Sequence, residues 1–245
     1  DLCRAAFPKL RFELKTVKTT GDKLQTASLA QHGSAVSKGL FTKELEMALL
    51  RHQADLAVHS LKDLPIALPA GLTLGAVTKR ADVRDVLLLR RTGALANDAW
   101  ANHPRHVPHP TENPLRNREL LLPNATVATS SIRRKAQLHE HRPDLAIIDI
   151  RGNVVTRLQK LAEASGPHAL VLARAGLDRL NLRIQPDGRL TGDAVPDGIW
   201  AFVLEPTVLV PAVGQGAIGV EIRQDDERMG AICAFLEHYN TRQCV

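Results

Sequence analysis

Apolar and polar residues recur along this chain in two rhythms, which predict strands and helices in turn. Over residues 10–17, apolar and charged residues alternate with a period of two, as in a half-buried strand. After Thr42, apolar residues are spaced for one helix face, which predicts a helix over 43–51 capped by Thr42. Apolar runs over 54–58 and 72–78 predict two further strands.

The alternation becomes regular after Arg84, where predicted strands and helices follow one another with short links. Apolar runs predict strands over 86–89, 125–129, 145–150 and 169–173. Helical spacing predicts helices over 132–141, over about 154–164, and from the end of the last strand to Leu180. This order is typical of an α/β fold with a parallel sheet and helices on both faces. Ligands bind such sheets beyond the carboxyl ends of the strands, where the polar loops of this chain fall.

The pattern stops over residues 92–124, a proline-rich stretch without periodicity that we interpret as a surface insertion. His103, His106 and His109 follow one another there at a spacing of three, which suggests metal binding as one interpretation. The prolines among them prevent a shared helix face, so we favour a solvated loop and predict no metal site.

Composition narrows the class of protein and of ligand. The 245 residues are 44% hydrophobic and 24% charged, as in an ordinary globular protein, and the net charge of +6 favours an anionic ligand. The aromatic content of 3% argues against a protein that stacks single-stranded nucleic acid. No apolar run reaches the roughly 18 residues of a membrane span. The cysteines form no CxxC pair, and their small number fits a reducing compartment.

The sequence SSIRR at 130–134 lies between a predicted strand and a predicted helix. Hydroxyls and free backbone N–H groups at a helix N-terminus bind anions, and Arg133 and Arg134 add donors suited to carboxylate or phosphate. Helix starts usually carry acidic residues, so we expect a bound anion to supply the missing negative charge. Two exposed arginines on a solvated helix are the alternative.

A second basic motif, Arg151-Gly152-Asn153 followed by Arg157, again lies between a strand and a helix. Arg151 should lie at the same sheet edge as the arginines of SSIRR, because both motifs follow carboxyl ends of parallel strands. Converging arginines indicate a ligand with several negative charges. A glycine turn with surface arginines is the alternative.

The loop at 59–65 carries His59, Ser60, Lys62 and Asp63, which together offer the groups of acid–base catalysis. An ionised Asp63 beside cations could stabilise a positive charge that develops during a reaction. An aspartate in a turn before proline is the alternative.

Residues 214–219, GQGAIG, match a dinucleotide-binding pattern. They run into VEIR at 220–223, which alternates like a strand, whereas that motif must open a helix. We therefore reject a nicotinamide or flavin site and expect a glycine-rich crossing between domains.

Together these segments resemble the porphobilinogen deaminase family of tetrapyrrole biosynthesis. The matching stretches fall in one order along the chain. They are KGLFTKELE at 38–46, AVHSLKDLP at 57–65, ATSSIRR at 128–134, RGNV with TR at 151–157, 173–180 and PAVGQGA at 211–217.

The resemblance implies two doubly wound α/β domains similar to type II periplasmic binding proteins, followed by a small third domain. We expect domain 1 over 1–79 and 212–234, and domain 2 over 80–211 with the insertion at 92–124. Residues 235–245 would begin a third domain that is largely absent. Nothing before residue 10 matches the strand and turn with which the family begins, so we expect a fragment or a divergent copy that turns over poorly.

The resemblance also implies a transferase that joins four porphobilinogen units head to tail, with loss of ammonia, in haem and chlorophyll biosynthesis. Its cofactor is a dipyrromethane held by a cysteine in a Gly-Gly-Cys sequence, and Cys3, Cys233 and Cys244 all lack that context. The expected partners are porphobilinogen and the growing polypyrrole chain, without nucleic acid or membrane, in a cytoplasmic monomer. A non-catalytic two-lobed module that binds an anionic solute is the alternative.

By the same resemblance Asp63 is the catalytic acid, which helps to expel the amine and stabilises the cation that forms. The other expected site residues bind the carboxylates of substrate and cofactor or let the backbone approach them. They are Lys38, Ser60, Lys62, Thr129, Ser130, Ser131, Arg133, Arg134, Arg151, Gly152, Arg157 and Gln215.

Overall fold

The computed structural model describes residues 2–17, 19, 42–90, 113–118 and 120–245. The chain divides into two compact units, which we call unit 1 (Asp1–Ala81 with Val213–Val245) and unit 2 (Asp82–Ala212). Unit 2 is therefore one continuous segment between the two parts of unit 1. These boundaries differ by one or two residues from the expected ones, and unit 1 includes 235–245, which the sequence analysis gave to a third domain.

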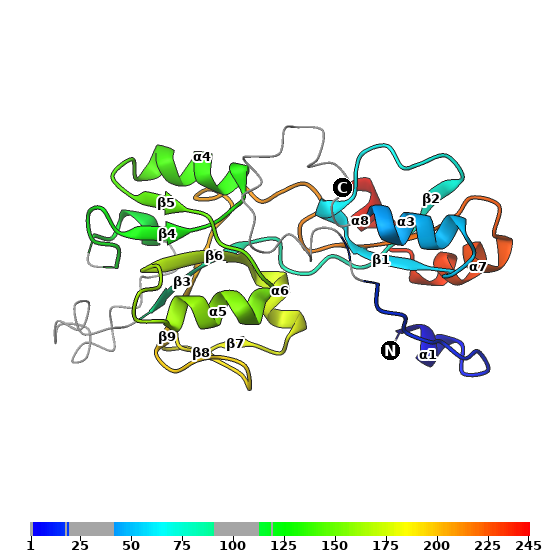
Figure 1. Ribbon diagram of the computed structural model, residues 1–245, viewed down its shortest axis with the longest axis horizontal. Helices are drawn as coiled ribbons and strands as arrows, with labels where there is room; N and C mark the ends of the chain where they lie inside the picture. The colour runs from blue at the N-terminus through cyan, green and yellow to red at the C-terminus, as the bar shows by residue number, and fades with distance from the viewer. Residues whose placement is uncertain (1, 18, 20–41, 91–112, 119) are drawn as a thin grey trace. The chain divides into compact units, whose positions relative to one another are not determined.

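Unit 2 contains a five-stranded sheet in the order β5-β4-β6-β3-β9 (Figure 1). Its strands are β3 (Asp85–Arg90), β4 (Thr126–Ala128), β5 (Ala146–Ile148), β6 (Ala169–Ala173) and β9 (Ile199–Leu204). The expectation of a parallel sheet is correct for β4 with β5 and β6, and wrong for β3, which is antiparallel to β6 and β9. Because β3 enters from unit 1 rather than from a crossover helix, no βαβ connection forces it to be parallel.

Helices cover both faces of this sheet, as predicted. They are α4 (Ile132–His141), α5 (Val154–Ala162) and α6 (Arg174–Arg179). Val86 and Leu88 of β3 join the apolar cluster under α5 and α6, whereas Leu87 and Leu89 join the cluster under α4. Burial on both faces explains why this strand has a continuous apolar sequence.

The end of the predicted surface insertion lies in the core. The single-turn helix η3 (Pro114–Arg116) packs Leu115 into the cluster under α4, and Leu120 and Leu121 are also buried. Buried Arg142 donates hydrogen bonds to the carbonyls of Leu115 (3.0 Å) and Leu121 (3.1 Å), which fixes this segment. The three histidines of the insertion lie outside the described residues. Unit 2 also holds a small ribbon of β7 (Arg183–Ile184) and β8 (Leu190–Thr191).

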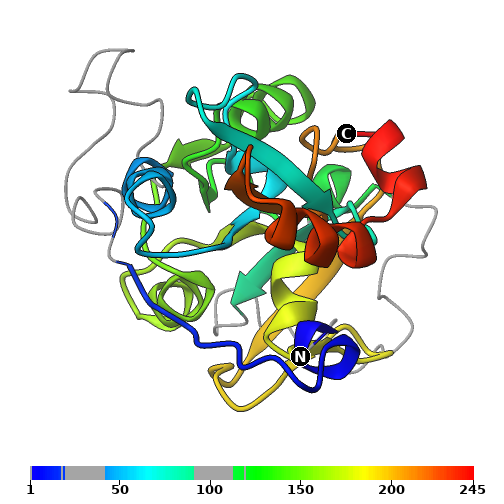
Figure 2. The same cartoon turned by 90° about the vertical axis from the view of Figure 1, so that its right-hand side faces the viewer.

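Unit 1 contains a three-stranded sheet in the order β1-β10-β2, with β10 antiparallel to both neighbours. Its elements are α1 (Leu2–Ala6), α3 (Lys43–Leu50), β1 (Ala57–Ser60), β2 (Leu72–Val77), β10 (Ile218–Arg223), α7 (Glu227–Leu236) and α8 (Tyr239–Gln243). Leu49 of α3 packs with Ala57 and Leu72, whereas Met229 and Ile232 of α7 pack in a separate cluster. Figure 2 shows α3 (blue) and α7 (orange-red) on either side of the strands.

Residues 10–17 do not form the predicted strand; the described residues 11–17 have no regular secondary structure. Leu10 and Phe12 pack against the α7 cluster, but Leu14 is 90% exposed, so the alternating residues do not share one buried face. Thr42 lies at the N-terminus of α3 as predicted, although its side chain makes no capping hydrogen bond.

Residues 237–243 are bound to β2, which explains why they belong to unit 1. The amide of His238 donates to the carbonyl of Val77 at 2.8 Å. The guanidinium of Arg242 donates to Glu237 and to the carbonyls of Leu74 (3.2 Å) and Gly75 (3.3 Å).

Candidate functional site

Two of the predicted motifs meet at one edge of the unit 2 sheet. Because β4 and β5 are parallel, the residues that follow both strands lie at the same edge. The hydroxyl of Ser130 donates to the carbonyl of Ile150 at 2.8 Å and accepts from the amide of Ile150 at 3.0 Å. This pair of bonds joins the loop before α4 to the loop before α5.

Polar side chains begin both helices at this edge. Asn153 accepts from the amide of Thr156 at 2.8 Å, and Ser131 accepts from the amide of Arg134 at 3.4 Å. The hydroxyl of Thr129 accepts from the amide of Ser131 at 3.2 Å, and Thr129 is buried. Its side chain therefore stabilises the turn and does not face solvent.

The two arginines of SSIRR share one buried carboxylate. Asp85 accepts from Arg133 at 2.8 Å and from Arg134 at 2.7 Å. Burial alone would raise the pKa of Asp85, but the charges and hydrogen bonds of Arg134 and Arg133 bring it below its usual value. The negative charge expected from a bound anion is therefore supplied here by Asp85, which was not predicted from the sequence. Its position directly before the apolar run 86–89 was the available signal.

The second basic motif folds back on its own loop. Gly152 has a φ of +111°, and an added Cβ would lie 2.7 Å from a side-chain carbon of Thr156, so glycine is required. Arg157 donates to the carbonyl of Gly152 at 2.7 Å, and Lys160 donates to the carbonyl of Arg151 at 3.1 Å. These bonds hold Arg157 over the loop, while Arg151 remains partly exposed.

In unit 1, Lys62 and Asp63 lie on the single-turn helix η2 (Leu61–Asp63), directly after β1, and both are exposed. Lys62 donates to the side-chain oxygen of Gln215 at 3.3 Å, and Gln215 is fully buried. The amide of Leu61 donates to the carbonyl of Ala217 at 3.1 Å. The glycine-rich segment therefore supports the turn that carries Asp63, and the strand predicted after it is confirmed as β10.

His59 of the same motif points into unit 1 and not toward solvent. Its Nε2 lies 3.0 Å from Oε2 of Glu221 in β10, and both side chains are buried. This hydrogen bond fixes the end of β1 against β10 and takes His59 out of the set of exposed acid–base groups. Glu221 was not singled out from the sequence.

Lys38 lies outside the described residues. Within the described ranges, no three His, Cys, Asp or Glu side chains gather as metal ligands. None of the helices that the structure describes has the length and apolar character needed to cross a membrane.

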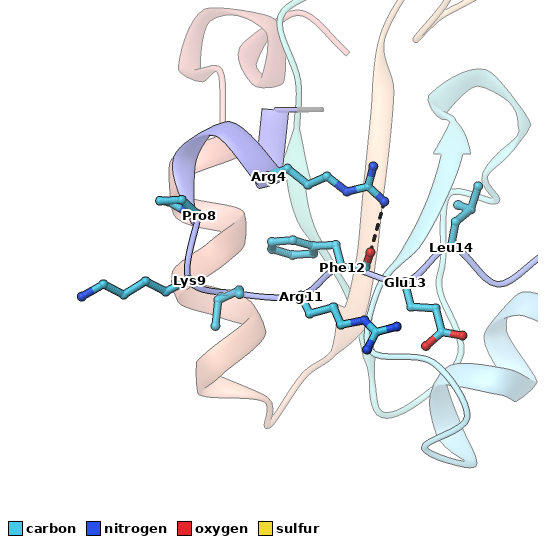
Figure 3. Close-up of a pocket in the computed structure, with 8 residues that line it drawn as sticks. Arg4, Pro8, Lys9, Arg11, Phe12, Glu13 and Leu14 are labelled. Carbon is cyan, nitrogen blue, oxygen red and sulfur yellow. Dashed lines mark hydrogen bonds between the residues drawn. The ribbon is translucent and has the colours of Figure 1, made fainter.

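A hollow of about 650 Å³ lies beside the N-terminal segment and is separate from these motifs. Its lining residues come from 4–14, and Arg4 reaches across to donate to the carbonyl of Phe12 at 3.2 Å (Figure 3). None of the predicted site residues lines it.

A family model described as "Porphobilinogen deaminase, dipyromethane cofactor binding domain" matches residues 2–231. The chain is 45% identical over 241 residues to the porphobilinogen deaminase of Moorella thermoacetica, an alignment that covers 98% of this chain and 64% of the relative. It is 41% identical over 245 residues to the porphobilinogen deaminase of Desulforudis audaxviator, covering 100% of this chain and 66% of that relative.

The chain thus spans 64% and 66% of the length of these two curated relatives. Among solved structures, it is similar to an ancestral cationic amino acid solute-binding protein, with a TM-score of 0.39 and 12% sequence identity. That alignment covers 83% of this chain and 70% of the other.

Proposed function

The chain belongs to the porphobilinogen deaminase family, and on that premise we propose that the full-length protein joins porphobilinogen units head to tail with release of ammonia. The observation that carries the proposal is the exposed carboxylate of Asp63, on a short turn beside Lys62 and supported by the buried glycine-rich segment. Membership of the family indicates porphobilinogen as the substrate, and Asp63 on this turn is the carboxylate that the proposed reaction needs.

Asp63 would act on the substrate where charge develops. Porphobilinogen carries an aminomethyl arm on a pyrrole ring, and departure of ammonia leaves a positive charge that the ring nitrogen shares. A carboxylate close to that nitrogen stabilises the developing cation, and a fixed carboxylate does so without reorganising during the reaction. The hydrogen bonds that hold η2 against Gln215 and Ala217 of the glycine-rich segment supply that fixed position.

The sheet edge of unit 2 would bind the acid side chains of the substrate and of the growing polypyrrole. Each pyrrole unit carries an acetate and a propionate, so the ligand is a polyanion. Arg133, Arg151 and Arg157 offer guanidiniums, which bind carboxylates through paired N–H groups. The N-termini of α4 and α5 add backbone N–H groups next to Ser131 and Asn153.

The donor set also fits a dipyrromethane cofactor, because that group carries carboxylates as well. Its expected ligands in this chain are the ammonium of Lys62 and the hydroxyls of Ser60 and Ser131, with the Gly152 and Gln215 segments allowing close approach, whereas the hydroxyl proton of Ser130 is already donated to the carbonyl of Ile150. When bound, the dipyrromethane supplies the pyrrole carbon to which the first substrate unit is joined. Its anchoring cysteine is not among Cys3, Cys233 and Cys244 in this proposal.

The test is porphobilinogen consumption and ammonia release by the full-length protein. Asp63→Asn should lower kcat by about 10²–10³, the usual effect of removing a group that stabilises developing charge. Asp225→Asn, which removes another exposed carboxylate of unit 1, is the control and should keep wild-type turnover. Wild-type turnover by Asp63→Asn would overturn the assignment of Asp63.

Binding of porphobilinogen by the wild-type protein without turnover would instead favour a non-catalytic module that binds anions. Such a module gains nothing from a carboxylate, so Asp63→Asn would then bind the ligand at least as tightly as wild type. The monomeric state and the cytoplasmic location stay predictions.

A further inference from the structure

Asp85 lies at the start of β3 with no exposed surface. Because β3 is antiparallel to β6, Asp85 pairs with Ala173, the last residue of β6, at the edge where α4 begins. Its two oxygens are divided between neighbouring residues of α4. Oδ2 accepts from Arg133 at 2.8 Å, and Oδ1 accepts from Arg134 at 2.7 Å.

The two arginines are held in different ways. Arg134 is 6% exposed and donates a second hydrogen bond to the buried carbonyl of Val171 at 2.9 Å. Arg133 keeps 23% of its side-chain surface exposed and donates its other bond to the carbonyl of Val210. Of this pair, Arg133 is therefore the guanidinium that an incoming carboxylate can reach.

We propose that Asp85 is a positioning residue for the reaction, which confines Arg134 to the interior and orients Arg133 toward substrate carboxylates. This inference rests on the proposed function. The buried carboxylate of Asp85 offsets one of the two positive charges of Arg133 and Arg134, so the three side chains together carry one net positive charge. A guanidinium has five N–H donors, so the bonds to Asp85 and Val210 leave donors of Arg133 for a ligand. Without Asp85, the adjacent guanidiniums repel each other, and Arg133 loses its fixed orientation.

The test uses the full-length protein and a double-mutant cycle. Asp85→Asn keeps the shape of the side chain and removes its charge, and it should raise the KM for porphobilinogen about tenfold to a hundredfold, with a much smaller change in kcat. The double variant Asp85→Asn with Arg133→Met should have the KM of Arg133→Met alone, because Asp85 acts through Arg133. If the KM of the double variant instead rises by the product of the two single-variant increases, the two residues act independently and the proposal is overturned.

A second measurement does not depend on activity. Phenylglyoxal modifies accessible guanidiniums, and peptide mass spectrometry should show Arg133 modified and Arg134 spared in the wild-type protein. In Asp85→Asn, Arg134 should become modified. Asp144→Asn is the matched control, because it removes the carboxylate partner of buried Arg142 at the other end of α4. That control should keep both the KM and the protection of Arg134.

The outcomes separate the two proposals. Absence of porphobilinogen turnover in the wild-type protein would defeat the proposed function, while the modification pattern would still test the role of Asp85. Equal protection of Arg134 in the wild type and in Asp85→Asn would overturn the positioning role whatever the activity. If Asp85→Asn does not fold, the wild-type protein suffices, since equal modification of Arg133 and Arg134 contradicts the proposal.

Discussion

Gly214 supports the turn that carries Asp63, and replacing it by alanine should displace that turn. Gly214 has a φ of +73°, and an added Cβ would lie 3.2 Å from the backbone nitrogen of Lys62 and 3.2 Å from Cγ of Leu61. The alanine variant should therefore lose unfolding free energy for two reasons. Alanine must adopt a left-handed backbone conformation, and its Cβ would crowd the backbone of Lys62, which cannot rotate away as a side chain could.

Gly71 provides the matched control for the left-handed backbone conformation. It lies in the same unit with a φ of +84°, but its added Cβ would meet a side-chain carbon of Leu50 at an ordinary 3.4 Å. Gly71→Ala should therefore cost about 1–2 kcal/mol of unfolding free energy, the cost of a left-handed conformation. Gly214→Ala should cost a further 1–3 kcal/mol or so, because crowding a packed site shifts backbone.

The assay is urea unfolding followed by circular dichroism, together with amide hydrogen exchange of the peptide around η2. Gly214→Ala should speed exchange at the amides of Leu61 and Leu64, which bond to the carbonyls of Ala217 and Leu61. Gly71→Ala should leave those amides unchanged. Equal destabilisation by the two variants, with unchanged exchange at η2, would refute the supporting role of Gly214.

Three further predictions concern the rest of the fold. Asn153→Ala should lower the unfolding free energy by about 1 kcal/mol in urea titrations, because the N-terminal cap of α5 is lost; an unchanged midpoint would contradict this. The pKa of Asp85 is lowered in the folded protein, so its stabilising effect is complete above its ordinary value of 3.8 and is lost as pH falls through the lowered pKa. The melting temperature of Asp85→Asn should therefore fall less steeply with acid than that of wild type, and parallel curves would contradict this. Burial, with smaller effects from Cys3 and Glu237, raises the pKa of the Cys233 thiol to about 11, so iodoacetamide at pH 8 should label exposed Cys244 well before Cys233. Equal labelling rates in the folded protein, read by peptide mass spectrometry, would contradict that order.

Elements with strong local signals could be predicted from the sequence. The helix over 132–141 and the strand over 169–173 have the predicted bounds, because a capping serine and a short run of buried apolar residues mark them locally. The ribbon of β7 and β8 has two residues in each strand, too few to show a period. The strand β9 and the helix α7 were also missed, although the apolar sequence of β9 resembles that of β6, which was predicted.

The residues of the candidate site also fall into two groups, those that local sequence motifs predict and those that only the fold brings together. The motifs around Asp63, Arg133 and Arg151 could be read as contiguous sequence, and the structure joins the two motifs of unit 2 through Ser130. The partners of Asp85 and Glu221 could not be found this way, because Asp85 meets Arg133 across 48 residues and Glu221 meets His59 across 162 residues. Charge alone could not show that Arg134 is buried, since only the antiparallel entry of β3 places a carboxylate beside it.

The role of Asp63 is tested most directly by rapid-quench mass spectrometry of the intact full-length protein mixed with porphobilinogen. Before mixing, Asp63→Asn should carry the same cofactor mass as wild type. After mixing, its mass should grow by pyrrole units about 10²–10³ times more slowly, while Asp225→Asn keeps the wild-type rate. Growth of Asp63→Asn at the wild-type rate would contradict a carboxylate that stabilises the cation left by ammonia.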